Sequence, residues 1–124
     1  MYGNSTGIRN TAIGGFALQD INRTSNATSD NTALGYEAGS INQGGSNTFI
    51  GSQADQFTAS SSINNASAIG YNAKVSASNS IQLGNTSVTN VATAGTLTAG
   101  AVTYPKIHGT SGEVLTTNGS GELT

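Results

Sequence analysis

The stretch NTAIGGFA at residues 10–17 decides the fold, because the chain repeats its pattern four more times. The copies are NTALGYEA at 31–38, NTFIGSQA at 47–54, ASAIGYNA at 66–73 and the weaker SIQLGNTS at 80–87. Each copy has a small or polar head, then Ile or Leu, Gly, two variable residues and usually Ala. Such self-similarity is typical of a chain that stacks one short unit on the next.

The glycine of the pattern fixes the phase of each repeat. Successive glycines are separated by 21, 16, 19 and 14 residues. The shortest spacing predicts the basic unit, and the longer ones predict inserted loops of turn-forming residues, such as NRTSN at 22–26 and QGGS at 43–46. We expect each glycine to permit a turn with positive φ or a close approach of backbones. These turn glycines are Gly14, Gly35, Gly51, Gly70 and Gly84.

The Ile or Leu before the glycine is the most regular large apolar residue, so we expect it to point into a narrow core. This repeat core comprises Ile13, Leu34, Ile50, Ile69 and Leu83. In a strand the preceding residue points to the opposite face. That second face carries Ala12, Ala33, Phe49, Ala68 and Gln82, and a partner chain is its expected cover. The Ala after the turn is expected where space is tight, and the head Asn in a ladder between repeats.

The composition favours an all-β chain. The 124 residues allow about one domain, and only 8% are charged, against about 25% in an average globular protein. Gly occurs 17 times, and the formal net charge of −2 is too low for an ordinary disordered segment. Ser, Thr and Asn suit stacked β-structure, whereas they are weak helix formers, and no helical apolar stripe persists.

Several classes of partner are not expected. Without cysteine the chain has neither disulfides nor thiolate metal sites. No stretch approaches the roughly 20 apolar residues of a membrane span, so we expect no membrane insertion within this chain. The start of the sequence lacks the basic and apolar pattern of a signal peptide. The four Lys and Arg residues are scattered, which argues against a nucleic-acid partner.

Residues 1–88, through these motifs, resemble the head repeats of trimeric autotransporter adhesins, which carry Asn-Ser-x-Ala-Ile-Gly-type motifs. The resemblance implies a left-handed parallel β-roll, or solenoid, in a homotrimeric fibre outside the cell. It also implies attachment to a surface receptor or glycan, neither of which the sequence identifies. The stretch YGNSTG at 2–7 looks like a loop between two motifs, so we expect the sequence to begin inside a repeat. Phe49 and Gln82 depart from the family's Ala.

Residues 89–124 form the second expected region, a shaft or connector. GTLTAGAVTYP at 95–105 and GTSGEVLTTNGSG at 109–121 resemble the segment before endosialidase-type intramolecular chaperone domains in phage tail fibres and bacterial surface proteins. That resemblance implies a chaperone that trimerises the fibre and cleaves itself off close to the end of this sequence. From the residues alone, alternation over 91–99 predicts an extended strand that ends before Pro105. NGSG at 118–121 predicts a hairpin turn.

Residues suited to catalysis are few. His108 is the only histidine, and the nearest serine for a triad is Ser111 in a Gly-rich stretch. We favour an exposed or trimer-facing His108, with an ion held by three copies on a trimer axis as the alternative. The six carboxylates form neither a calcium loop nor a close pair, and Gly44-Gly45 lacks the Lys of a phosphate loop. We therefore expect no catalytic, cofactor or metal site, and no enzyme.

Four exposed or loop aromatics have two interpretations, packing between repeats or stacking on sugars, and packing is favoured. They are Phe16, Tyr36, Phe57 and Tyr71. The leading functional prediction is a structural segment of an extracellular trimeric fibre for adhesion or surface attachment, with inserted loops such as 40–46 as contacts. The alternative is a receptor-binding tail fibre of a phage or injection device. An ice- or mineral-binding surface would need a regular Thr array, and the Thr positions in this sequence are too irregular for one. A polysaccharide-cleaving spike would need paired carboxylates, and no pair is evident within one chain, which leaves a site shared between chains as the open alternative.

Overall fold

The computed structural model describes residues 7–19, 29–59, 62–100 and 102–104. All the regular elements in these ranges are β-strands, and none of them is a helix, which confirms the all-β prediction. In the same ranges no helix reaches the length and hydropathy that a membrane span requires. The chain divides into two compact units, Met1–Thr89 and Asn90–Thr124. The sequence had suggested a boundary one residue earlier.

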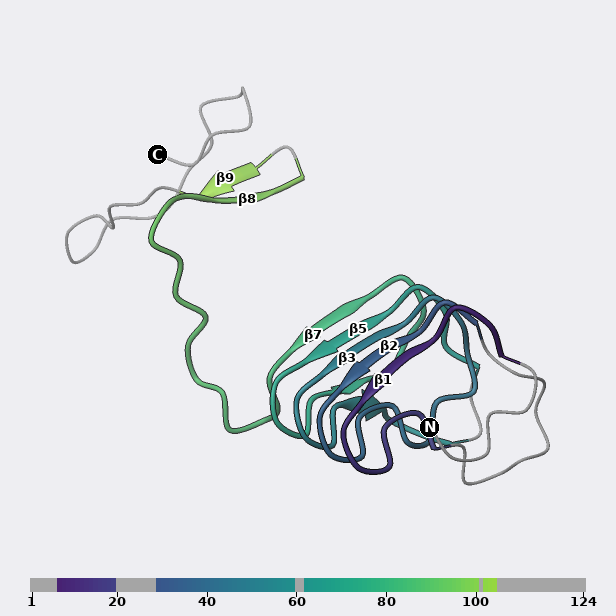
Figure 1. The fold of residues 1–124 in the computed structure, drawn as a ribbon. Coiled ribbons are helices and arrows are strands. Elements are labelled where there is room, and N and C mark those ends of the chain that lie inside the picture. The colour runs from purple at the N-terminus through teal and green to yellow at the C-terminus, as the bar shows by residue number, and fades with distance from the viewer. Residues whose placement is uncertain (1–6, 20–28, 60–61, 101, 105–124) are drawn as a thin grey trace. The chain divides into compact units, whose positions relative to one another are not determined.

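The first unit is built on a five-stranded sheet to which each repeat contributes one strand (Figure 1). All neighbouring strands are parallel, and their spatial order follows the chain. They are β1 (Thr11–Ile13), β2 (Thr32–Leu34), β3 (Thr48–Ile50), β5 (Ser67–Ile69) and β7 (Ile81–Leu83). A second parallel sheet pairs β4 (Asp55–Gln56) with β6 (Lys74–Val75).

The strand register aligns equivalent positions of the repeats into three rows across the five-stranded sheet. The first row is Thr11, Thr32, Thr48, Ser67 and Ile81; the middle row is Ala12, Ala33, Phe49, Ala68 and Gln82; the third row is Ile13, Leu34, Ile50, Ile69 and Leu83. Because side chains alternate between the faces of a strand, the middle row points one way and the two flanking rows the other. Equivalent positions pair although the repeats differ in length, so the inserted loops leave the register unchanged.

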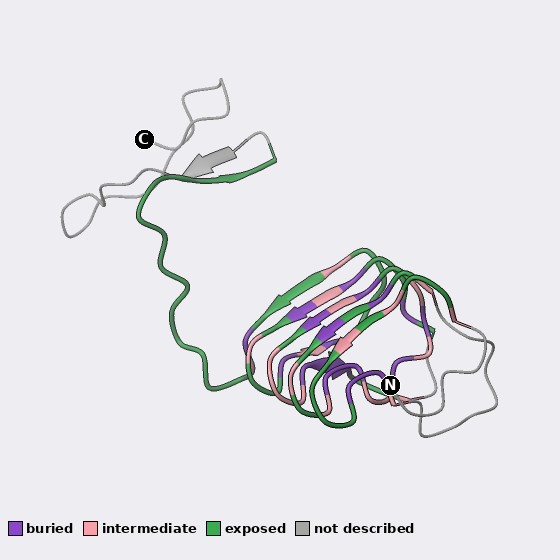
Figure 2. Cartoon of the chain, in the orientation of Figure 1, coloured by how far each residue is buried: buried purple, intermediate pink, exposed green. Residues whose placement is uncertain are grey.

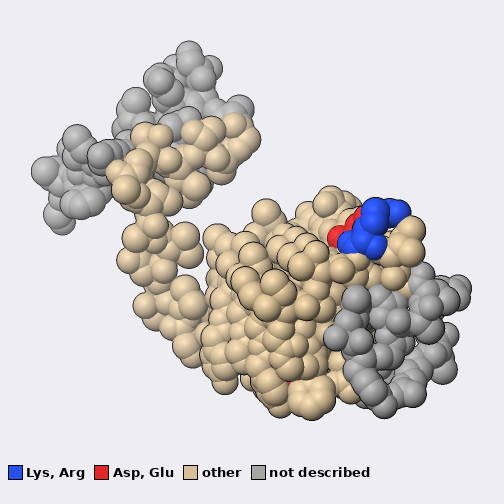
Figure 3. All heavy atoms as spheres, viewed as in Figure 1, with Lys and Arg blue, Asp and Glu red and all other residues tan. Residues whose placement is uncertain are grey.

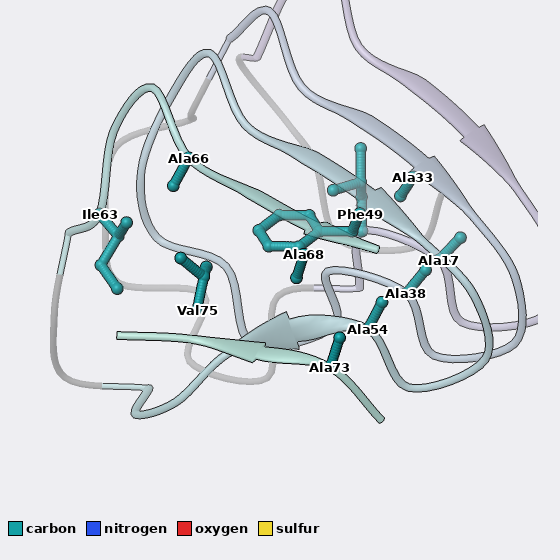
Figure 4. Close-up of a cluster of buried hydrophobic side chains, with 11 residues drawn as sticks. Ala17, Ala33, Ala38, Phe49, Ala54, Ile63, Ala66, Ala68, Ala73 and Val75 are labelled. Atoms are coloured by element: carbon teal, nitrogen blue, oxygen red, sulfur yellow. The ribbon is translucent and has the colours of Figure 1, made fainter. Parts of the chain in front are cut away.

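The core of the first unit is lined mainly by small residues from the middle row and from the Ala after each turn (Figures 2 and 4). In the middle row, Ala33, Phe49 and Ala68 are fully buried. The alanines after the turns are also 0% exposed: Ala17, Ala38, Ala54 and Ala73. Phe49 is the largest fully buried side chain, and Val75 of β6 lies in the same cluster.

The predicted repeat core therefore faces the wrong way in the single chain. Ile13, Leu34, Ile50, Ile69 and Leu83 are 38–60% exposed. The alternation of faces was predicted correctly, but the choice of the inner face was inverted. The reason is the narrow space inside the unit. The strands and the segments that follow the turns lie close together, and the gap between them accommodates alanine side chains from each. The bulkier aliphatic row therefore lies outside.

Buried asparagines join successive repeats along one side of the core. The backbone N–H of Asn31 donates to Oδ1 of Asn10, and the N–H of Asn47 donates to Oδ1 of Asn31, each over 2.9 Å. The N–H of Ala66 in turn donates to Oδ1 of Asn47. The amide of Asn47 also donates to the Ile63 carbonyl. The head asparagines thus form the expected ladder, and it ends where the head becomes alanine.

The turn after each strand stacks glycine on glycine. Gly35 has φ of +137° and Gly51 has φ of +124°, a region that residues with a Cβ rarely adopt. A Cβ on Gly51 would lie 2.6 Å from the carbonyl oxygen of Gly70, and one on Gly35 would lie 2.6 Å from the carbonyl carbon of Gly51. All five turn glycines have positive φ. Glycine is therefore required here by both the backbone angle and the close approach.

The described part of the second unit contains a short antiparallel hairpin. Strand β8 (Leu97–Ala99) pairs with β9 (Val102–Tyr104), and Gly100 between them has φ of +63°, as tight hairpin turns favour. The predicted strand over 91–99 is thus too long, because its first half forms no strand. The predicted turn at 118–121 lies outside the described residues.

Candidate interaction surface

The outer face of the five-stranded sheet carries the first and third rows of the register. Its third row is entirely aliphatic, and its first row is hydroxyl-bearing except for Ile81. All ten residues are uncharged, and Ile81 is 70% exposed. In Figure 3 the described atoms on the visible side of the unit are almost all tan, and the charged atoms lie at its margins. Contiguous exposed apolar surface of this kind marks an interaction site.

The hydroxyl row is more regular than the sequence suggested. Thr11, Thr32 and Thr48 are direct register neighbours, followed by Ser67. Irregular Thr positions were the reason given against an ice- or mineral-binding surface, and in the register Thr occupies three of the five first-row positions, followed by Ser67 and Ile81. The neighbouring row adds a second reason. The adjacent row is aliphatic instead of hydroxyl-bearing, so the hydroxyls form a single line and not a two-dimensional array.

A second surface lies at the turns that follow the strands. We call it the turn strip, and it consists of the two variable residues after the first four turn glycines. Its backbone segments run side by side: the N–H of Glu37 donates to Gly15, that of Gln53 to Tyr36, and that of Asn72 to Ser52. The turn strip is Gly15, Phe16, Tyr36, Glu37, Ser52, Gln53, Tyr71 and Asn72.

Side chains of the turn strip are held by one another. The rings of Phe16 and Tyr36 meet edge to face, with centroids 5.8 Å apart and planes at 78°. A hydrogen bond to Glu37 raises the pKa of Tyr36 above its ordinary value. Glu37 Oε2 also accepts a hydrogen bond of 3.1 Å from Nε2 of Gln53. The predicted packing between repeats holds for Phe16 and Tyr36, yet both rings remain about half exposed.

The backbone of the turn strip adopts left-handed angles at its second position in every repeat. φ is +60° at Phe16, +54° at Glu37, +60° at Gln53 and +51° at Asn72. Asn tolerates this region, whereas a bulky residue such as Phe is uncommon there. The sequence pattern treated these positions as variable and gave no signal of the constraint, apart from the Asn in the fourth repeat.

The loop at 40–46, whose contact with a target stays a prediction, is bound into the body of the unit. Its Asn42 is buried, and Oδ1 of Asn42 accepts a hydrogen bond from the amide of Asn47. Gly44 is also buried, and a Cβ there would overlap the backbone of Ile63. Removing this loop would therefore damage the fold. The insertion at 22–26 lies outside the described residues.

One carboxylate is buried beneath that loop. Asp55 in β4 is 1% exposed and accepts hydrogen bonds from Ser40 Oγ (3.2 Å), the Ile41 N–H (3.0 Å) and the Gln56 N–H (2.8 Å). Burial raises the pKa of Asp55 above its ordinary value, and these hydrogen bonds together with nearby Lys74 act in the opposite direction. Since every contact is internal, we assign Asp55 to holding the loop, not to chemistry.

Other charges in the described residues do not gather into a site. Arg9 and Asp30 form an exposed ion pair, whose hydrogen bonds hold the pKa of Asp30 below its usual value. Within the described ranges no three His, Cys, Asp or Glu residues are placed to hold a metal ion. His108, with its alternative as an axial ion ligand, and Ser111 lie outside these ranges, so the expected absence of metal and catalytic sites stays a prediction.

Comparison with known proteins found no matching family model, no matching curated protein and no matching solved structure.

Proposed function

We propose that this chain is a structural segment of an extracellular homotrimeric fibre whose role is adhesion or attachment to a surface. In this proposal residues 1–88 form a left-handed parallel β-roll, the repeats stack along the fibre, and the chain is not an enzyme. The alternative carrier of the same segment is the receptor-binding tail fibre of a phage or injection device. Both place it on the outside of a cell or particle.

The observation that carries the proposal is the exposed third row on an uncharged sheet face. Five aliphatic side chains lie in line at the strand spacing of about 4.8 Å. A second copy of the chain presents the same row with the same period, so side chains of the two copies can interdigitate along the whole face. A partner without this period would match it at isolated points only. Self-association is therefore the cover that fits best.

The chemistry of the face agrees with a permanent interface. Obligate interfaces are more apolar than the rest of a protein surface and are depleted in charge at their centre. Here both conditions hold, because the face is uncharged and its third row is aliphatic. Small residues already fill the interior, so the aliphatic row has no other place to be buried.

The direct test is the molar mass of the protein in solution by light scattering. We expect three times the chain mass, and a stable monomer would refute the trimer. Ile50→Asp, in the central strand of the outer face, should shift the mass toward the monomer, because a buried charge at an interface is strongly unfavourable. Ser76→Asp, at an exposed position outside the sheet, is the matched control and should leave the mass unchanged. Circular dichroism should show unchanged strand content for both variants.

A further inference from the structure

The exposed rings of the turn strip are arranged with a regular spacing. Tyr36 and Tyr71 occupy the same position in repeats that are two strands apart, with Ser52 between them. Two strand spacings amount to about 9.5 Å. That distance is comparable to two pyranose rings of an extended oligosaccharide. Tyr36 is 49% exposed and Tyr71 is 64% exposed, so both rings present surface on which the C–H face of a sugar can stack.

Polar groups lie beside these rings in a fixed arrangement. Oε2 of the Glu37 carboxylate already accepts a hydrogen bond from Gln53 Nε2, and the carboxylate raises the pKa of the neighbouring Tyr36. A carboxylate has about four lone-pair sites, so it retains capacity to accept from two sugar hydroxyls.

The charge of the strip restricts the ligand. Glu37 is its only ionisable group besides the tyrosines, and it has no Lys, Arg or His. One cation lies beside the strip, because Nζ of Lys74 donates a hydrogen bond of 2.8 Å to the Gln53 carbonyl oxygen. The Glu37 carboxylate and the Lys74 ammonium balance each other in charge, so the strip has no excess of positive charge to attract sulfated or sialylated sugars or the phosphates of nucleic acids. The complementary partner is therefore rich in hydroxyl groups and carries no negative charge.

We propose that the turn strip is a binding site for neutral oligosaccharides, stacked on Tyr36 and Tyr71 and hydrogen-bonded to Glu37. The proposal rests on the attachment role proposed above and names the ligand class for it. It is separate from self-association, which uses the outer face of the sheet.

The repeats themselves supply substitutions that the fold already accepts. Tyr71→Ser and Glu37→Gln each introduce the residue that the third repeat carries at the same position, and Phe16→Asn introduces that of the fourth. The control is Ser46→Asn, at a left-handed position outside the strip where the next repeat has Asn65. Phe16→Asn and Ser46→Asn should both keep or raise the melting temperature, since Asn suits left-handed angles.

The probes are immobilised chito-, cello- and malto-oligosaccharides, with a heparin oligosaccharide as the anionic comparison, followed by calorimetric titration of the full chain. We expect at least one neutral series to bind and heparin not to bind. Tyr71→Ser and Glu37→Gln should weaken binding about tenfold or more, as loss of a central contact does. Ser46→Asn should bind as the parent does.

Three results of the binding experiments overturn the proposal: no neutral oligosaccharide binds, only heparin binds, or the Tyr71→Ser and Glu37→Gln variants bind as well as the parent. Attachment to a protein surface that survives enzymatic deglycosylation would assign the strip to a protein partner and also overturn it. Light scattering on the same samples separates the two proposals. A trimer without sugar binding refutes the sugar site alone, and a sugar-binding monomer refutes the trimer alone.

Discussion

The two faces of the five-stranded sheet are built on opposite rules. The inner face carries Ala33, Phe49 and Ala68 without exposure, whereas the outer face carries the larger aliphatic row at 38–60% exposure. Most proteins bury their large apolar residues and expose small or polar ones. The difference teaches that the distance between layers, not hydrophobicity alone, decides which face is inside. It also leaves the single chain with apolar surface that a partner can cover.

The largest expected effect comes from truncating the two neighbours Phe49 and Ile50, which lie on opposite faces. Phe49→Ala should lower the free energy of unfolding by about 3–5 kcal/mol, since it leaves a cavity in the core. Ile50→Ala should cost less than about 1 kcal/mol in the dissociated chain. Denaturant titration at low protein concentration measures both.

A larger cost for Ile50→Ala than for Phe49→Ala at the lowest concentration would contradict the assignment of the two faces. A cost for Ile50→Ala that grows with protein concentration would instead report a partner over the outer face, because association stabilises by mass action.

Removing the side chain of Asn47 tests the polar margin of the inner face. Asn47→Ala loses its hydrogen bonds to Asn42, Ile63 and Ala66 and leaves buried polar groups unsatisfied. We expect a loss of about 2–3 kcal/mol in the free energy of unfolding. Amide hydrogen exchange should lose protection first at the Ala66 N–H. Unchanged protection there would show that the ladder does not hold the repeats together.

Enlarging one residue on the inner face and one on the outer face should give a smaller difference in stability than the truncations above. Ala68→Leu adds volume to a filled interior and should cost about 1–3 kcal/mol. Its neighbour Ser67 lies on the outer face, so Ser67→Leu should change stability by about 0.5 kcal/mol or less. Thermal unfolding of the two variants side by side makes the measurement. Equal tolerance at both positions would mean that the inner space is wider than the structure has it.

The smallest expected effect is the contribution of buried Asp55 to the pH dependence of the unfolding free energy. Its pKa is raised in the folded protein, so the folded state binds the proton more tightly than the unfolded state. The resulting stability is fully present below the unfolded value of about 3.9 and is lost as pH rises through the folded pKa. The unfolding free energy of the parent minus that of Asp55→Asn should therefore fall as the pH rises above about 4.

Asp30 contributes a pH dependence of stability with the opposite sign. Its pKa is lowered in the folded protein, so its stabilising contribution is lost as pH falls. It is present in both proteins and cancels in the difference. A difference that is flat across this range would show that burial does not raise the pKa of Asp55.

Much of the fold was predictable from the sequence, because equal spacing from the glycine places one strand in every repeat. Alternation then assigned Ala12 and Ile13 to opposite faces, but alternation does not say which face is inside. The prediction placed the larger Ile and Leu side chains inside because of their size. The two rows of alanine, one before and one after the turn, are the signal that two closely spaced layers face each other. Only the structure reveals such a pairing between positions five residues apart in sequence.

The candidate surfaces were predictable in part. The aromatic residues were identified from the sequence, but their edge-to-face contact and the Glu37–Gln53 hydrogen bond depend on neighbouring repeats. The packing of the loop at 40–46 was not predictable, because turn-forming composition indicates a loop without indicating whether it packs. Its buried Asn42 and Gly44 are fixed by contacts with residues 5 to 19 positions later.

Because the turn glycines stack on one another, the length of the chain does not fix the length of the stack of strands. Each repeat advances by one strand spacing, about 4.8 Å, whether it contains 14 or 21 residues. Residues added between the fixed points widen a repeat without lengthening the stack. Insertions can therefore change the width and the surface chemistry of a repeat, whereas the length of the stack changes only when a whole repeat, with its turn glycine, is added or removed.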